Sequence, residues 1–229
     1  EIDHGLVGSE MCIRDSINRS QSSNDSIPTA MHIATVLSIK KILLPKISIF
    51  KKSLKKKISE FKGIIKIGRT HTQDATPIKI SNEFLAFYDQ ISYAENVIKK
   101  SLDKLYELAQ GGTAVGSGVN APKNFSKIFI KYLKKETGLP FKSAPNKYES
   151  LASHDVFIEV MSGVEILTSA LFKMANDIRV LASGPRSGIS ELILPANEPG
   201  SSIMPGKINP TQCEACLLYT SPSPRDHEQ

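Results

Sequence analysis

Apolar side chains recur at helical spacing in three long stretches of the chain. Within residues 30–61, 79–109 and 151–183, successive apolar positions are three or four residues apart, which places them on one face of a helix. Such narrow apolar seams pack at shallow angles against similar helices. The pattern predicts an all-α protein, a bundle of long helices that lie side by side.

Two positions interrupt these series. Ser101 stands where the second series would carry its next apolar residue. Pro45 is expected to bend the first helix or to end it near Leu44, because proline cannot donate the helical hydrogen bond.

Three segments between the helices differ in kind from the helices themselves. Residues 64–77 begin with a short extended run and then turn polar, and residues 108–122 form a glycine-rich connection. Residues 194–210 contain four prolines and two glycines among 17 positions, so they cannot form a helix. Polar loops of this kind, held by long rigid helices, are where we expect functional side chains.

Composition and charge narrow the class of protein. Of the 229 residues, 40% are hydrophobic, and no apolar run approaches the roughly 18 residues of a membrane helix. The net charge of +6 comes from residues 40–66, which hold ten lysines and one acid. That stretch has no arginine, and its aromatic residues fall on the apolar face. It predicts a solvated helix surface rather than a nucleic-acid interface.

Three cysteines, Cys12, Cys213 and Cys216, are too few for a disulfide framework, and their odd number is typical of a reducing compartment. Cys213 and Cys216 form a C-x-x-C pair. Because no second pair and no histidine at zinc spacing accompany it, we expect neither a metal site nor a redox site there.

Candidate chemistry gathers in the proline-rich loop. Gly200, Ser201 and Ser202 offer hydroxyls and unhindered backbone N–H groups, an arrangement that can bind an anion, and Lys207 and Asn209 follow them. The set suits a substrate that carries a carboxylate.

Two other polar clusters are open to two interpretations. Ser22, Ser23 and Asn24 precede a predicted helix, where they could bind an anion or could merely cap the helix through Ser26 or Asp25. His71 follows Thr70 in the first polar segment, and a lone histidine is more often structural than catalytic.

These same residues lie in motifs that resemble a known family. GSSIMPGKINPTQCEA (200–215) is similar to the signature loop of the fumarase/aspartase superfamily. INRSQSSNDSIPTAMHIA (17–34), IGRTHTQDATP (67–77) and LAQGGTAVGSGVN (108–120) resemble class II fumarate hydratases in order and spacing. The resemblance covers residues 17–215.

The resemblance implies the central helical domain of that superfamily, with short extended segments in its loops. It implies the reversible anti addition of water to fumarate to give L-malate in the tricarboxylic acid cycle, without metal or organic cofactor. It further implies a homotetramer whose active sites are shared between subunits, with no nucleic-acid partner and no membrane. The expected compartment is the cytoplasm, with the mitochondrial matrix as the alternative.

The resemblance also implies roles for individual residues. Ser201 matches the base that removes a carbon proton from malate, His71 matches the acid/base group linked to the water, and Glu214 matches the residue that polarises it. A roughly 30-residue helix is about 45 Å long, so we expect the Ser201 and His71 loops, at opposite ends, not to meet within one chain. The matched substrate contacts are Ser22, Ser23, Asn24, Thr70, Ser202, Lys207, Ile208 and Asn209.

Domain boundaries and alternative functions complete the expectations. Residues 1–16 and 216–229 lack the periodicity of the centre and are predicted to be non-native tails, which leaves 17–215 as a partial helical lyase domain. One alternative is an aspartase-type ammonia-lyase of the same superfamily. Another, of a different class, is a non-catalytic helical assembly module whose basic helix binds polyanions.

Overall fold

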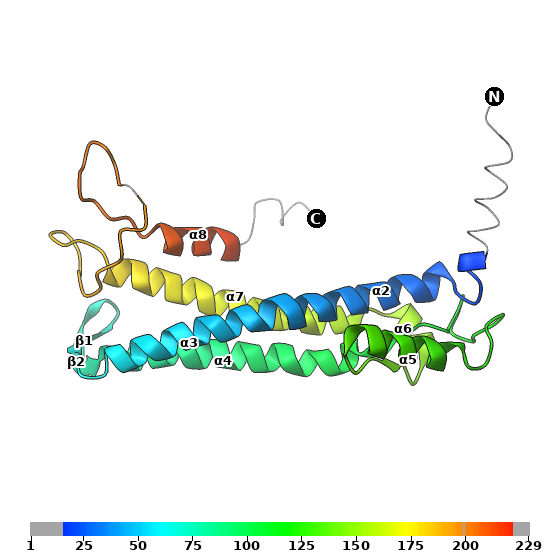
Figure 1. Ribbon diagram of the computed structural model, residues 1–229. Coiled ribbons are helices and arrows are strands. Elements are labelled where there is room, and N and C mark those ends of the chain that lie inside the picture. Colours follow the sequence, from blue (N-terminus) through cyan, green and yellow to red (C-terminus); the bar gives the residue numbers. More distant parts are fainter. Residues whose placement is uncertain (1–15, 199, 222–229) are drawn as a thin grey trace, which may run out of the picture. The chain divides into compact units, whose positions relative to one another are not determined.

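The computed structural model describes residues 16–198 and 200–221, and Figure 1 shows that helices dominate it. The chain divides into two compact units. Of the described residues, the first unit holds 16–46 and 97–161, and the second holds 47–96, 162–198 and 200–221.

The first predicted helix is present and contains an irregular turn. Helix α2 (Ser23–Ser38) continues through a π-helical turn, η1 (Ile39–Leu43), into α3 (Leu44–Glu60). The irregular turn immediately precedes Pro45, whose missing N–H and bulky ring disturb the regular ladder. The helix therefore neither ends at Leu44 nor runs through as regular α-helix.

Helix α4 (Ile80–Leu105) confirms the second series. Ile91, Ile98 and Leu105 are buried, and the interrupting Ser101 is fully buried too, with its hydroxyl donating to the Ile98 carbonyl at 2.8 Å. The helix ends four residues before the predicted end at 109. There the chain turns extended as β3 (Glu107–Leu108), which pairs in parallel with β4 (Lys142–Ser143).

Helix α7 (Asp155–Leu181) confirms the third series, and Val160, Leu167 and Met174 are all buried along it. The helix begins later than the predicted residue 151. Residues before it form a separate short helix, α6 (Lys147–Ala152), which ends where Ser153 adopts extended backbone.

Packing within the first unit joins helices that are distant in sequence. The His32 ring of α2 meets the Phe157 ring of α7 edge-on at 5.2 Å, and His32 Nδ1 lies 3.1 Å from the carbonyl of Leu105. Helix α5 (Phe125–Thr137) ends at Gly138, whose φ of 67° forms a left-handed cap. Three residues after Gly138, the buried Phe141 ring packs on Tyr106.

The second unit is also built on helix-to-helix contacts. Phe61, just after α3, packs on Phe84 of α4 with ring centroids 5.1 Å apart, and Lys51 of α3 pairs with Glu95 of α4 at 2.7 Å. Lys173 of α7 lies over the Phe87 ring of α4. The same unit carries a hairpin of β1 (Ile65–Thr70) and β2 (Gln73–Lys79), and the terminal helix α8 (Thr211–Thr220).

These contacts confirm the predicted all-α bundle of long helices. Among the helices that the structure describes, none is long and apolar enough to cross a membrane. Cys12 and most of both predicted tails lie outside the described residues, and the tail boundaries remain predictions. Helix α8 runs across the predicted boundary at residue 216.

Candidate active site

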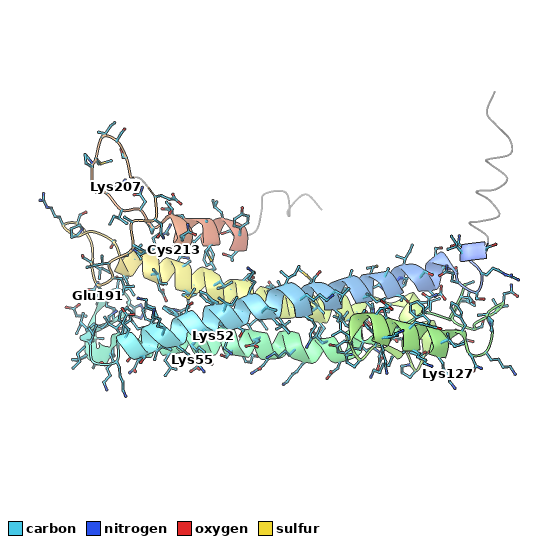
Figure 2. All side chains as sticks on the ribbon, in the orientation of Figure 1. Lys52, Lys55, Lys127, Glu191, Lys207 and Cys213 are labelled. Atoms are coloured by element: carbon cyan, nitrogen blue, oxygen red, sulfur yellow. The ribbon has the colours of Figure 1, made fainter. Side chains whose placement is uncertain are left out.

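The predicted site residues fall in three segments. Ser22, Ser23 and Asn24 lie at the start of α2 in the first unit. In the second unit, Thr70 and His71 lie at the β1–β2 turn, and residues 200–214 form the loop before α8 and its first turn. Figure 2 labels Lys207 on that loop.

The first segment is a capped helix terminus. Ser22 is the N-cap: its hydroxyl accepts a hydrogen bond from the Asn24 N–H at 3.3 Å, and its own N–H donates to Asp25 Oδ1 at 2.8 Å. The two residues thus form a capping box. The capping interpretation is confirmed for Ser22 with Asp25, while the side chains of Ser23 and Asn24 remain exposed.

The glycine-rich connection packs against this terminus. The Asn24 amide donates to the Ala114 carbonyl at 2.8 Å, and Asp25 Oδ2 accepts from the backbone N–H groups of Gly111 and Thr113 at 3.0 and 2.9 Å. A hollow of about 160 Å³ lies between the two segments and is lined by Ser22 and Thr113, among others. The sequence pattern identified residues 108–122 only as a connection, whereas in the structure they form one wall of the Ser22 cluster.

His71 occupies a tight hairpin turn. His71 and Thr72 both have positive φ, 52° and 63°, as a two-residue hairpin turn of the primed type requires. Glycine and asparagine usually fill such positions, so two other residues there store local strain, and such strain clusters at functional sites. The imidazole of His71 is exposed at the tip of the turn.

An ion cluster anchors the base of this hairpin. Glu191, in the segment after α7, pairs with Arg69 through one oxygen and lies 2.6 Å from Lys66 Nζ through the other. Lys66 also pairs with Glu83 of α4 at 2.8 Å. Burial by itself would raise the pKa of Glu191, but the hydrogen bond from Arg69 and the ion pair with Lys66 outweigh it and lower the pKa below its ordinary value.

The proline-rich loop closes on itself at its neck. A Cβ added to Gly200 would lie 2.2 Å from the Lys207 carbonyl oxygen, so only glycine fits there. Inside the loop, the N–H of Met204 donates to the Ser201 carbonyl at 3.1 Å, and the N–H of Ile203 donates to Ser201 Oγ at 3.3 Å. Ser202, Lys207, Ile208 and Asn209 are exposed along it.

The expectation about the separation of Ser201 and His71 needs a correction. The hairpin precedes α4 and the loop follows α7, and the Arg69–Glu191 pair joins these two segments, so they do not lie at opposite ends of a helix. Within the described residues, no hydrogen bond or ion pair joins the His71 side chain to Ser201 or Glu214. The premise that these loops lie at opposite ends of a helix was therefore wrong.

The cysteine pair of α8 is partly buried. Burial raises the pKa of both Cys213 and Cys216, so both thiols stay protonated at neutral pH and are weak nucleophiles. Among the residues that the structure describes, no group of three or more His, Cys, Asp or Glu side chains could hold a metal ion.

Together, the three segments present hydroxyls, amides, one imidazole and one ammonium group on exposed loops and helix ends. Backbone N–H groups at a helix N-terminus attract carboxylates, and so does a lysine side chain. An imidazole at the tip of a hairpin can donate or accept a proton. These groups suit acid/base chemistry on a small, negatively charged substrate.

Comparison with known proteins shows the class to which this fold and these motifs belong. The family described as "Lyase" matches residues 4–221, and the chain belongs to this lyase family.

Its relatives within the family are fumarate hydratases by name. "Fumarate hydratase, mitochondrial" of Dictyostelium discoideum is 55% identical over 204 residues, which are 89% of this chain and 42% of the relative. The protein of the same name from Homo sapiens is 50% identical over 219 residues, 95% of this chain and 43% of the relative. The crystal structure of class II fumarase from Schistosoma mansoni matches with a TM-score of 0.87 and 41% identity, over 90% of this chain and 46% of that chain. This chain therefore spans less than half the length of these relatives.

Proposed function

We propose that this chain is the central part of a fumarate hydratase, which adds water reversibly to fumarate to give L-malate. The proposal rests on the similarity to named relatives together with the arrangement of the loop before α8. Relatives that are 50 to 55% identical over most of the chain bear this name, and the loop in which Gly200 approaches the Lys207 backbone carries Ser201 and Lys207, with Asn209 two residues further on.

The electrostatic demand of the reaction fits the loop. Removal of a carbon proton next to a carboxylate of malate places a second negative charge on that carboxylate. The barrier then depends on fixed donors and cations that receive the charge. Lys207, whose backbone approaches Gly200, supplies a positive charge, and Asn209, two residues later, supplies amide donors.

Ser201 is the proposed base and His71 the proposed acid/base group for water. A serine hydroxyl is a poor base unless its alkoxide is stabilised, and Lys207 is the positive charge of its own loop. His71 would be oriented by Glu214, as the resemblance implies. Because no hydrogen bond joins them within the described part of this chain, the proposal requires that they meet in an assembly.

Assembly is thus part of the proposal. We assign the complete protein a homotetrameric state in which segments from different copies form each site around a small dicarboxylate. The compartment stays a prediction: the relatives named above are called mitochondrial, which supports the matrix alternative over the cytoplasm.

The test uses the complete chain, with the parts that the relatives have and this sequence lacks. We expect it to convert fumarate to L-malate and to lose that activity in Ser201→Ala, measured by product formation in both directions. Ammonia release from aspartate without hydration of fumarate would instead assign an aspartase-type lyase. Salt-sensitive DNA binding without either activity would favour the polyanion-binding module.

A further inference from the structure

We infer that Asp25 is a positioning residue of the candidate active site. It anchors the glycine-rich segment, and that segment holds the Asn24 side chain in place. The inference rests on the proposed function and adds to it a residue that makes no proposed contact with substrate. The juxtaposition that carries it is a fully buried carboxylate that joins the segment of residues 22–24 to the glycine-rich segment, 86 residues away in sequence.

Both carboxylate oxygens of Asp25 accept hydrogen bonds. Oδ1 accepts from the Ser22 N–H at 2.8 Å and from the Ser26 hydroxyl at 3.3 Å. Oδ2 accepts from the N–H groups of Gly111 and Thr113 at 3.0 and 2.9 Å, and the Gln110 amide lies 3.5 Å away. One oxygen therefore binds α2 and the other binds the glycine-rich segment.

The glycine-rich segment needs such an anchor. Thr113 has a φ of 57°, which is rare for a β-branched residue, and Gly111 has a φ of 90°. Two N–H groups that converge on one oxygen form an anion-binding arrangement of the backbone. The carboxylate thus holds the segment in a conformation that Thr113 would otherwise avoid.

The anchored segment in turn holds Asn24. Ala114, the residue after Thr113, accepts the Asn24 side-chain amide at 2.8 Å, so the position of its carbonyl fixes the orientation of the Asn24 side chain. Asn24 is exposed and has few other constraints on its rotamer. Loss of the Asp25 anchor would release the carbonyl that orients it.

The test is a double-mutant cycle in the complete chain, with kcat/KM for fumarate as the measurement. Asp25→Asn keeps the shape of the side chain. In either orientation of the new amide, its NH₂ group faces a backbone N–H, of Ser22 on one side or of Gly111 and Thr113 on the other, so that hydrogen bond is lost. We expect kcat/KM to fall about 10²-fold, the loss typical of a misplaced contact group. In an Asn24→Ala background, Asp25→Asn should lower kcat/KM by less than about 3-fold, because the effects of mutations at two coupled residues do not add.

Phe141→Leu is the matched control, because Phe141 is fully buried in the same unit and its ring packs on Tyr106, which is not a proposed site residue. It should lower the melting temperature and leave kcat/KM within about 2-fold, since it perturbs packing alone. If Asp25→Asn fails to fold, Gln110→Met is used instead, because it removes only the weak contact to Asp25 Oδ2. The smaller fall in kcat/KM that it causes must also disappear in the Asn24→Ala background.

Equal losses in the two backgrounds, or a folded Asp25→Asn with unchanged kcat/KM, would overturn the positioning role while the hydratase proposal stands. A complete wild-type chain that does not hydrate fumarate would overturn the proposed function itself.

Discussion

Two carboxylates anchor candidate site segments in this chain, and they do so in different ways. In the first unit, Asp25 is fully buried and accepts mainly backbone N–H groups. In the second unit, the Glu191 side chain is 16% exposed and holds the base of the His71 hairpin through Arg69 and Lys66. Figure 2 labels Glu191 in the segment that follows α7.

The two anchors should respond differently to mutation and to salt. Backbone donors cannot swing away, and leaving them unpaired in the interior costs the full loss of their hydration. Arg69, whose side chain is 23% exposed, can turn toward solvent and is screened by salt, whereas the Lys66 side chain is only 5% exposed. The first anchor should therefore be rigid and insensitive to salt, and the second should be weaker and sensitive to salt.

The largest expected effect is on the first anchor. Asp25→Ala leaves the N–H groups of Gly111 and Thr113 without a partner, at about 1 to 3 kcal/mol each. We expect the free energy of unfolding of the first unit to fall by about 3 kcal/mol or more, measured by urea denaturation with amide exchange at both residues. A loss below about 1 kcal/mol would show that the buried anchor is no stronger than a surface contact.

A smaller effect is expected for the second anchor. Glu191→Gln removes the charge that Arg69 and Lys66 share, but Lys66 keeps its pair with Glu83. We expect the free energy of unfolding to fall by about 1 to 2 kcal/mol at low salt, which is less than the loss when one partner of a buried ion pair is removed and the other is left alone. The difference from wild type should shrink in 1 M salt, where the Debye length is about 3 Å. An equal loss at both salt concentrations would contradict the contrast with Asp25, whose variants serve as the control.

The smallest effect concerns pH and the packing of His32 in the first unit. Burial lowers the pKa of His32 below its ordinary value of 6.5, and the nearby His154 and Lys104 lower it further, while carbonyl contacts to Leu105 and Glu107 oppose them. The unfolded chain therefore binds this proton more readily than the folded chain. Stability should fall as the pH drops through the ordinary pKa.

The measurement is the melting temperature between about pH 7.5 and pH 5.5, a range that brackets the ordinary histidine pKa. His32→Gln should flatten the profile over this range. A variant profile as steep as that of wild type would assign the pH dependence to other groups.

Much of the helical framework could be predicted because burial follows a local period. The series through Val160, Leu167 and Met174 gave the buried face of α7 directly. Strand β2 was not expected, because Gln73–Lys79 is mostly exposed and shows no alternation. Helix α5 was also missed, although Gly138 after a lysine-rich turn is a helix stop signal.

The candidate site residues could be named from the sequence and stay predictions, whereas the contacts that hold their segments could not be foreseen. Motif resemblance points to Ser201 and His71, but the relation between Asp25 and Gly111 joins residues that no short-range pattern connects. The positive φ of His71 and Thr72 likewise depends on strand pairing, which the polar sequence around them does not indicate.

The most direct test of the hydratase proposal compares two lysines in the complete chain. Lys207→Met removes the charge on the proline-rich loop, whereas Lys55→Met removes a charge from the exposed face of α3, and Figure 2 shows both positions. We predict that Lys207→Met lowers kcat for malate dehydration by about 10² to 10³, the usual effect of one lost charge-stabilising group. Lys55→Met should leave it nearly unchanged. If Lys207→Met keeps more than about a tenth of the wild-type kcat, where such a group normally costs at least 10², the loop is not the electrostatic centre of the reaction.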